Sequence, residues 1–101
     1  MSISENLTKL DEIIHQPVRT RIIAFLINTK GSDYVTLKIA LGLSDGHMST
    51  HMKVLVNSGY VNMTKAFVAN KPKTTYEITD KGKKQFKQYL ANLKTIIEGQ
   101  K

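Results

Sequence analysis

The stretch "LSDGHMSTHMKVLVNSGYV", residues 43–61, has the apolar spacing of a helix but a small and polar first turn. Met48, Met52 and Leu55 stand at i, i+4 and i+7, so they point inward from one face of that helix. Ser44 is suited to cap its N-terminus. The opposite face is short and polar, and consists of Asp45, Gly46, His47, Ser49, Thr50 and Lys53. A face without bulky carbon lets another molecule approach the helix backbone.

Three further helices are predicted upstream of this stretch. Apolar residues at helical spacing predict an amphipathic helix within residues 1–15. Pro17 stands at a first-turn position of a second helix, whose broad apolar face is expected in the core. A short extended piece at residues 32–35 follows, and Thr36 can cap a brief helix at residues 37–41.

Downstream, the pattern changes to that of a β-hairpin. Residues 60–68 are rich in β-branched and aromatic side chains, and residues 74–79 alternate like a returning strand. Between them "ANKPK", residues 69–73, is predicted to be the turn. A last helix is expected over residues 80–98, with Thr79 as its cap. Its apolar residues recur at three- and four-residue steps, and are Phe86, Tyr89, Leu90, Leu93, Ile96 and Ile97.

The order of these elements is that of a winged helix-turn-helix. A tight turn between two helices supports this, because Gly42 permits the chain reversal and Leu43 fills the gap between the helices. A chain of 101 residues has room for one such domain. The sequence therefore predicts a single domain over residues 1–101, mainly α with a small β hairpin (α+β), in which a three-helix core carries the wing and the terminal helices.

The net charge of +7 is unevenly distributed along the chain. Residues 62–88 contain Glu77 and Asp80 as their acids against seven lysines, which are Lys65, Lys71, Lys73, Lys81, Lys83, Lys84 and Lys87. A basic patch gains from counterion release when it meets phosphates, so the pattern indicates a polyanionic partner. The alternative is an ordinary solvated lysine face.

Composition and motifs argue against several classes of protein. The chain contains no cysteine, which excludes disulfides and thiolate metal sites. Apolar runs stay short of the ~20 residues of a membrane span, and the N-terminus lacks a basic start and an apolar core, so a cytoplasmic protein is expected. There is no glycine-rich phosphate loop and the carboxylates are scattered, so neither an enzyme nor a cofactor is predicted.

In such a fold the helix over residues 44–58 enters the major groove of DNA with its first turns against base edges. This approach would explain the glycine at position 46, because a residue without a side chain lets the helix backbone come close to the DNA. The wing, residues 62–79, is expected on the flanking backbone or in the minor groove. There Lys71 and Lys73 would neutralise phosphates without reading bases.

Three segments resemble the small ArsR-like and MarR-like winged-helix transcriptional regulators. They are "PVRTRIIAFL", "LGLSDGHMSTHMKVLVNSGYV" and "KAFVANKPKTTYEITDKGKKQF", and the resemblance covers roughly residues 13–97. It implies a sequence-specific regulator that binds double-stranded DNA. The residues that it implies for DNA contact are Gly46, His47, Ser49, Thr50, Lys53, Asn70, Lys71 and Lys73.

Two features of the resembling segments concern single residues. Arg19 and Arg21 open the second helix, where an arginine of this family can serve either the fold or a phosphate. The wing tip departs from the family, because it reads Ala69-Asn70 where relatives often carry a glycine. Asn tolerates the left-handed conformation that such a turn requires.

The resemblance also implies a homodimer, and the terminal helices, residues 1–15 and 80–98, give an independent reason. Each has more apolar surface than a three-helix core with a small sheet needs, and monomers rarely expose patches of several hundred Å². A two-fold dimer would bury this surface and set two recognition helices roughly 34 Å apart. A small-molecule effector, if the protein has one, would have to bind at the dimer interface.

Three other functions stay open at this point. His47 and His51 have an i, i+4 spacing that can bind zinc, but a metal sensor needs more ligands, and His15 belongs to another helix. An RNA-binding module would share the lysines but prefer single-stranded or stem-loop RNA. A protein-interaction module would carry an apolar outer face on the hairpin and no lysine cluster.

Overall fold

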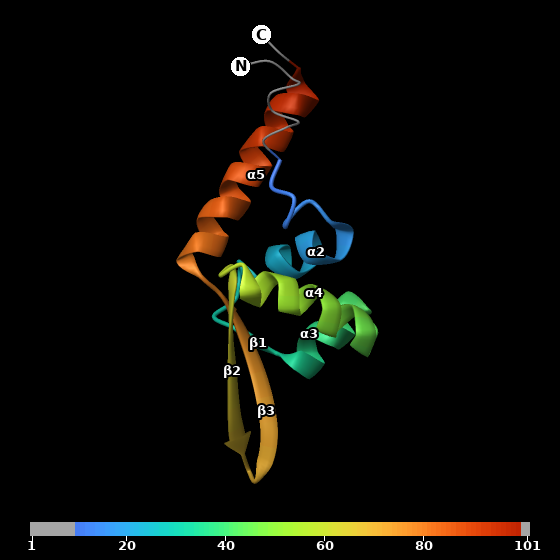
Figure 1. The fold of residues 1–101 in the computed structure, drawn as a ribbon, viewed down its shortest axis with the longest axis vertical. Coiled ribbons are helices and arrows are strands. Elements are labelled where there is room, and N and C mark those ends of the chain that lie inside the picture. The colour runs from blue at the N-terminus through green and yellow to red at the C-terminus, as the bar shows by residue number, and fades with distance from the viewer. Residues whose placement is uncertain (1–9, 100–101) are drawn as a thin grey trace.

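The structure, a computed structural model, describes residues 10–99. Figure 1 shows a group of helices from which a β-hairpin and a long helix project in opposite directions. In chain order the elements are α2 (Pro17–Leu26), β1 (Ser32–Asp33), α3 (Tyr34–Leu41), α4 (Asp45–Asn57), β2 (Val61–Val68), β3 (Lys71–Ile78) and α5 (Asp80–Glu98). This order confirms the predicted α+β class, with a wing between α4 and α5.

The core lies where α2, α3 and α4 meet the base of the hairpin and the first half of α5. Met48, Met52 and Leu55 are buried, which confirms the inward face predicted for α4. The other large buried residues are Ile14, Ile22, Ile23, Leu26, Leu37, Leu43, Tyr60, Val61, Tyr76, Ile78, Phe86 and Tyr89. Because one continuous cluster joins all these elements, α4 has a fixed orientation relative to the hairpin.

The helix-turn-helix begins earlier than the sequence predicts. The side chain of Asp33 accepts a hydrogen bond from the backbone N–H of Thr36 at 2.7 Å, so Asp33 is the cap and Thr36 lies inside the first turn. Helix α3 therefore starts at Tyr34. At its other end Gly42 has a φ of 62°, a left-handed conformation that ends α3 and reverses the chain as predicted.

The predicted helix at residues 1–15 is absent from its described part. Residues 1–9 lie outside the described residues, and residues 10–16 form turns and bends. The Asp11 carboxylate accepts hydrogen bonds from the N–H groups two and three residues later, at 2.8 and 3.2 Å, and so favours a turn over a helix. This turn brings Ile14 fully into the core.

The wing is a tighter hairpin than the sequence predicts. Its loop consists of Ala69 and Asn70, whose φ angles are 53° and 62°. Positive φ at both central residues is typical of a type I′ turn, which matches the twist of paired strands. The predicted turn at residues 69–73 is therefore too long, because pairing resumes at Lys71. Strand β1 adds a third strand in the order β1-β3-β2, but it pairs with β3 no closer to the tip than Thr75.

Helix α5 is anchored at its first turn, packs on the core through its first half and then extends beyond it. Thr79 caps it as predicted, since its hydroxyl accepts a hydrogen bond from the Gly82 N–H at 2.9 Å. Gly82 packs on the backbone of Tyr60, where an added Cβ would lie 2.3 Å from the carbonyl oxygen. From this anchor α5 extends away from the hairpin (Figure 1). Neither α5, with its 19 residues, nor any other helix within residues 10–99 combines the length and apolar character needed to cross a membrane.

Candidate nucleic-acid interface

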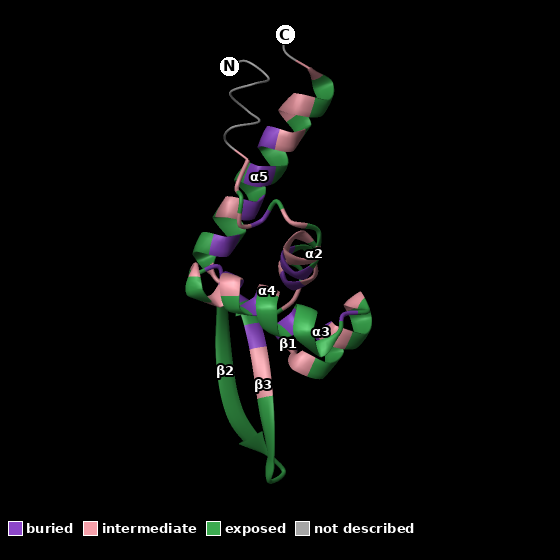
Figure 2. Ribbon diagram, turned by 45° about the vertical axis from the view of Figure 1, so that its right-hand side comes forward, coloured by how far each residue is buried: buried purple, intermediate pink, exposed green. Residues whose placement is uncertain are grey.

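The solvent side of α4 holds one group of the residues predicted to contact DNA. Figure 2 shows exposed residues along this helix beside its buried stripe. The predicted residues that are exposed there are Gly46, His47, Ser49, Thr50 and Lys53. The helix start is regular, because the Ser44 hydroxyl accepts a hydrogen bond from the His47 N–H at 3.1 Å. Hydroxyl, imidazole and ammonium groups thus lie within the first turns of one rigid helix.

Gly46 is not required by the fold. A Cβ added to Gly46 would meet nothing nearer than the hydroxyl oxygen of Ser44, at 3.9 Å. Its φ is not among the positive values found at four other glycines. Alanine is the better helix former, so a glycine here has no intramolecular explanation.

The first turn of α4 is fastened to α3. Tyr34 donates its hydroxyl hydrogen to Asp45 Oδ1 at 2.6 Å, and Lys38 Nζ lies 2.8 Å from the same oxygen. The bond from Lys38, followed by that from Tyr34, holds the pKa of Asp45 below its usual value. Donation to Asp45 raises the pKa of Tyr34 to about 12. These contacts assign Asp45 a role in orienting the helix.

Both arginines of α2 contact the protein itself. Arg19 Nε donates to the carbonyl of Ile13 at 2.5 Å, and its Nη1 lies 3.0 Å from Nδ1 of His51. Arg21 donates to the carbonyl of Leu41. Of the two roles open from the sequence, the geometry therefore supports the structural one.

The two histidines of α4 differ in their surroundings. His47 is exposed, whereas burial lowers the pKa of His51 and the nearby Arg19 and His47 lower it further. Their ring centroids lie 6.2 Å apart. Within residues 10–99 there is no group of three or more His, Cys, Asp or Glu side chains that could hold a metal ion. A zinc site would need ligands beyond this pair.

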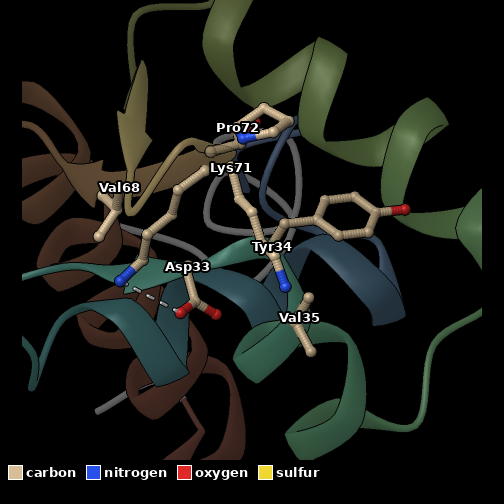
Figure 3. Close-up of a pocket in the computed structure, with 8 residues that line it drawn as sticks. Asp33, Tyr34, Val35, Val68, Lys71 and Pro72 are labelled. Carbon is tan, nitrogen blue, oxygen red and sulfur yellow. Dashed lines mark ion pairs between the residues drawn. The ribbon is translucent and has the colours of Figure 1, made fainter.

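The second group of predicted residues lies at the wing tip. Asn70, Lys71 and Lys73 are all exposed, at or next to the two-residue loop. Lys73 Nζ lies 3.8 Å from Asp33 Oδ2. A dashed line at Asp33 marks this ion pair in Figure 3. Between the free edge of β3 and the start of α3 there is an open groove of about 440 Å³, which is lined by Asp33, Tyr34, Val35, Val68, Lys71, Pro72, Lys73 and Thr74.

The sequence prediction omits two exposed residues of the wing, Lys65 and Phe67. Because side chains alternate along a strand, both share a face of the hairpin with Val61 and Met63. Val61 is buried against the core, and Met63 lines a groove of about 370 Å³ beside α4 together with Lys53. Counting in steps of two from the buried end of the strand would have placed both residues on the side of α4.

The lysine-rich part of the sequence does not form one surface patch. Three of its seven lysines lie on the hairpin and four on α5, which extends the other way. Lys81 on α5 is engaged within the chain, since its Nζ donates to the carbonyl of Ser58 at 2.8 Å and lies 5.4 Å from the centroid of the Tyr60 ring. The lysines that accompany the exposed face of α4 are therefore those of the hairpin.

Comparison with known proteins relates this geometry to sequence families and solved structures. A family of winged helix DNA-binding domains matches residues 18–97. An uncharacterized protein of Methanocaldococcus jannaschii is 34% identical over 79 residues, which cover 78% of this chain and 86% of that protein. A transcriptional regulator homologue from Pyrococcus horikoshii OT3 superposes with a TM-score of 0.86 at 32% identity, and covers 93% of this chain and 95% of that chain.

More distant solved structures share the fold. A MarR-family protein from Porphyromonas gingivalis W83 has a TM-score of 0.68 at 25% identity, with 86% of this chain and 84% of that chain covered. The PcaV transcriptional regulator from Streptomyces coelicolor, solved with its natural ligand, has a TM-score of 0.70 at 16% identity. That match covers 90% of this chain and 63% of PcaV, and shows likeness of fold alone.

Proposed function

Because this chain belongs to the winged helix DNA-binding domain family, we propose that it is a sequence-specific transcriptional regulator that binds double-stranded DNA as a homodimer. Helix α4 enters the major groove, and the wing, residues 62–79, lies on the flanking backbone or in the minor groove. Proteins of this family regulate transcription and are not enzymes, as the sequence predicts. The predicted cytoplasmic location belongs to this proposal, because a regulator that binds DNA works at the chromosome.

The observation that carries the proposal is the exposed surface of the first two turns of α4. The major groove is about 12 Å wide and admits an α-helix. His47, Ser49 and Thr50 carry hydrogen-bond donors and acceptors on side chains that are short enough to keep the helix close to base edges. Gly46 has no reason within the chain to be a glycine, and close approach to DNA supplies one. Lys53, one turn further on, suits a phosphate.

The wing tip supplies the second contact in this proposal. Asn70, Lys71 and Lys73 are exposed beside a loop that is only two residues long. Ammonium groups at such a tip neutralise phosphates on either side of a groove and carry no sequence information themselves. Their contribution to binding should therefore be similar on specific and unrelated duplexes.

The homodimer is supported by the outer surface of α5. Leu90 is 47% exposed and Ile97 is 81% exposed, and their seven-residue spacing places them on one face of the helix. Because the second half of α5 extends beyond the core, the part of the chain from residue 10 to residue 99 leaves this face largely exposed. Pairing with a second copy about a two-fold axis would bury the face and set the two recognition helices roughly one DNA turn apart.

A small-molecule effector belongs to the same proposal. A cavity of about 430 Å³ lies between the start of α2 and α5, lined by His15, Gln16, Pro17, Thr20, Arg21 and Tyr89. His15 Nδ1 lies 2.9 Å from the Tyr89 hydroxyl, so polar groups converge on an otherwise apolar wall. PcaV was solved with its natural ligand, which makes a ligand reasonable for a protein of this fold. A ligand in this cavity would touch α5, the proposed dimer helix.

Salt titrations of matched variants test the DNA-binding proposal. We expect Ser49→Ala with Thr50→Ala to reduce preference for a selected duplex over a scrambled one by roughly 1 to 3 kcal/mol, because these variants cannot hydrogen-bond base edges through the two hydroxyls. Lys71→Ala with Lys73→Ala should weaken both duplexes alike and flatten the plot of log K against log salt by about 0.9 for each phosphate that is no longer neutralised. Lys84→Ala with Lys87→Ala on α5 is the control, since it removes the same charge outside the interface.

Fluorescence anisotropy on labelled duplexes provides the measurement. The proposal fails if the parent protein shows no preference for any duplex selected from random sequence. Tighter binding to stem-loop RNA than to duplex DNA would favour the RNA-binding alternative instead. An equal decrease of salt dependence in the α5 control would mean that the wing has no special contact with DNA.

A further inference from the structure

Phe67 is a large apolar side chain in a place where the fold does not use it. It is 79% exposed near the wing tip, and its neighbours Val68 and Met63 are 53% and 44% exposed. Figure 2 shows strand β2 exposed along nearly its whole length. A phenyl ring left in water forgoes the free energy of burial, about 1.5 to 3 kcal/mol, so an external partner is the natural explanation.

The Phe67 ring lies on the face of the hairpin that is turned toward α4. Phe67 is paired with Pro72 across the strands, and Met63 is paired with Tyr76. Cross-strand partners share a face, and faces repeat every two residues, so these four side chains lie on one face. Met63 and Tyr76 already form the wall of the groove beside Lys53 of α4. Phe67 and Pro72 extend that wall toward the tip.

The tip that carries Phe67 is narrow and stiff. Pro72 has a fixed φ and lies beyond the point where β1 stops pairing, so β3 has a free edge there and the missing N–H costs no ladder bond. The loop itself consists of the small residues Ala69 and Asn70. On the same face as the ring, Lys65 adds a positive charge two cross-strand pairs closer to the core.

We propose that Phe67, backed by Pro72, is an apolar wedge that contacts the minor groove of DNA beside the major-groove site of α4. This inference rests on the proposed function. Phenylalanine and proline are among the side chains that press between base steps in the minor groove and kink the duplex, with basic residues on the adjacent phosphates. The wing then reads how easily the DNA deforms, a property that depends on sequence at positions without base-edge contacts.

A protein partner is the competing explanation for an exposed phenyl ring on a hairpin. The charge of the hairpin favours DNA, because Lys65 shares the face of the ring, Lys71 and Lys73 lie on the opposite face beside the loop, and no acidic residue lies between residues 62 and 76. The position of the ring favours DNA as well, since the face that carries it leads directly to Lys53 on α4. A second copy of the chain at this position would be detected as a change in association state.

The test compares Phe67→Ala with the control Val68→Ala, which removes an exposed apolar side chain from the adjacent position on the opposite face. Lys65→Ala provides the electrostatic comparison. We expect Phe67→Ala to weaken binding to the selected duplex on the order of 10-fold with an unchanged salt slope, because the ring releases no counterions. Lys65→Ala should reduce that slope, and Val68→Ala should bind within about twofold of the parent.

Two further readouts identify the wedge. Bending, measured by energy transfer between dyes at the duplex ends, should decrease in Phe67→Ala and persist in Val68→Ala. Replacing a flexible TA or CA step under the wing by a stiff A-tract should weaken the parent but leave Phe67→Ala nearly unaffected. Thermal unfolding should match the parent, since the ring is exposed.

Parent-like affinity and bending in Phe67→Ala would overturn the wedge while leaving the proposed function intact. A change in sedimentation of Phe67→Ala without DNA would assign the ring to a protein contact and also overturn it. If the parent itself binds no duplex, the proposed function has failed, and that outcome differs from both.

Discussion

Replacing Gly46 with alanine should strengthen the fold and weaken DNA binding. The methyl group would meet no atom closer than 3.9 Å, so it enters without a clash. Alanine loses less backbone entropy than glycine on entering a helix, which we expect to add roughly 0.5 kcal/mol to the free energy of unfolding. In a complex where the backbone of Gly46 lies against DNA, the same methyl group has to be accommodated in a packed contact. That costs about 1 to 3 kcal/mol, or roughly 5- to 150-fold in affinity.

Gly82→Ala is the matched control, because it places the same methyl group on another helical glycine with the opposite surroundings. Its Cβ would lie 2.3 Å from the carbonyl oxygen of Tyr60 and 2.9 Å from Cγ1 of Ile78. Backbone cannot rotate out of the way, so α5 has to move, and the bond from the Thr79 N–H to the same carbonyl, now 3.0 Å, is strained. We expect a decrease of roughly 2 to 4 kcal/mol in the free energy of unfolding.

Urea unfolding followed by circular dichroism measures both stabilities, and anisotropy on the selected duplex measures the affinity of Gly46→Ala. A folded, stabilised Gly46→Ala that binds DNA as tightly as the parent would refute close backbone approach at this residue. A destabilised Gly46→Ala would instead show that the glycine serves the fold in a way that its open surroundings do not explain.

Three other substitutions or conditions give further predictions. Ala69→Gly should stabilise the protein by roughly 1 kcal/mol, because Ala69 holds a left-handed φ of 53°, and an unchanged urea midpoint would contradict the type I′ loop. Leu90→Glu with Ile97→Glu should yield a folded monomer in sedimentation, since both side chains are exposed in one chain, and a persisting dimer would exclude this face of α5. The pKa values of Asp33, bonded to a backbone N–H, and of Asp45, bonded to a lysine, lie below the usual 3.8, so their stabilisation is present above that pH and is lost as the pH falls through the lowered values. Acid unfolding should accordingly be less steep below about pH 4 in Asp33→Asn with Asp45→Asn, and identical profiles would exclude both carboxylates as its cause.

The helix-turn-helix was predictable because its determinants are local. In α4 the inward spacing of Met48, Met52 and Leu55 and the cap at Ser44 lie within a few turns, and the structure contains both. Gly42 likewise ends α3 through its own backbone conformation. The exposure of the polar face follows from the same periodicity, so that surface could be identified without coordinates.

The misplaced elements depend on competition or on distance in the chain. Asp33 and Thr36 both have side chains suited to an N-cap, and in the structure the Asp33 carboxylate accepts the hydrogen bond from the Thr36 N–H, so the helix starts at Tyr34. Near the N-terminus the Asp11 side chain offers backbone N–H groups a turn in place of the predicted helix. The lysines that are close in sequence separate in space, because the chain leaves the hairpin at Thr79 and α5 departs in the other direction. Sequence position alone does not contain that change of direction.

The tight seat of Gly82 on Tyr60 has a consequence for the spacing of DNA sites. If α5 joins two copies as proposed, this contact fixes each α4 relative to α5. The distance and the angle between the two α4 helices of the dimer are then fixed as well. Each base pair added between the half-sites moves one of them by about 3.4 Å and turns it by roughly a tenth of a helical turn. A dimer of fixed geometry cannot follow such a rotation. It should therefore bind only pairs of half-sites whose separation is correct to within one base pair. A substitution that loosens the contact between Gly82 and Tyr60 should widen the range of half-site separations that the dimer accepts, before it abolishes binding to either half-site.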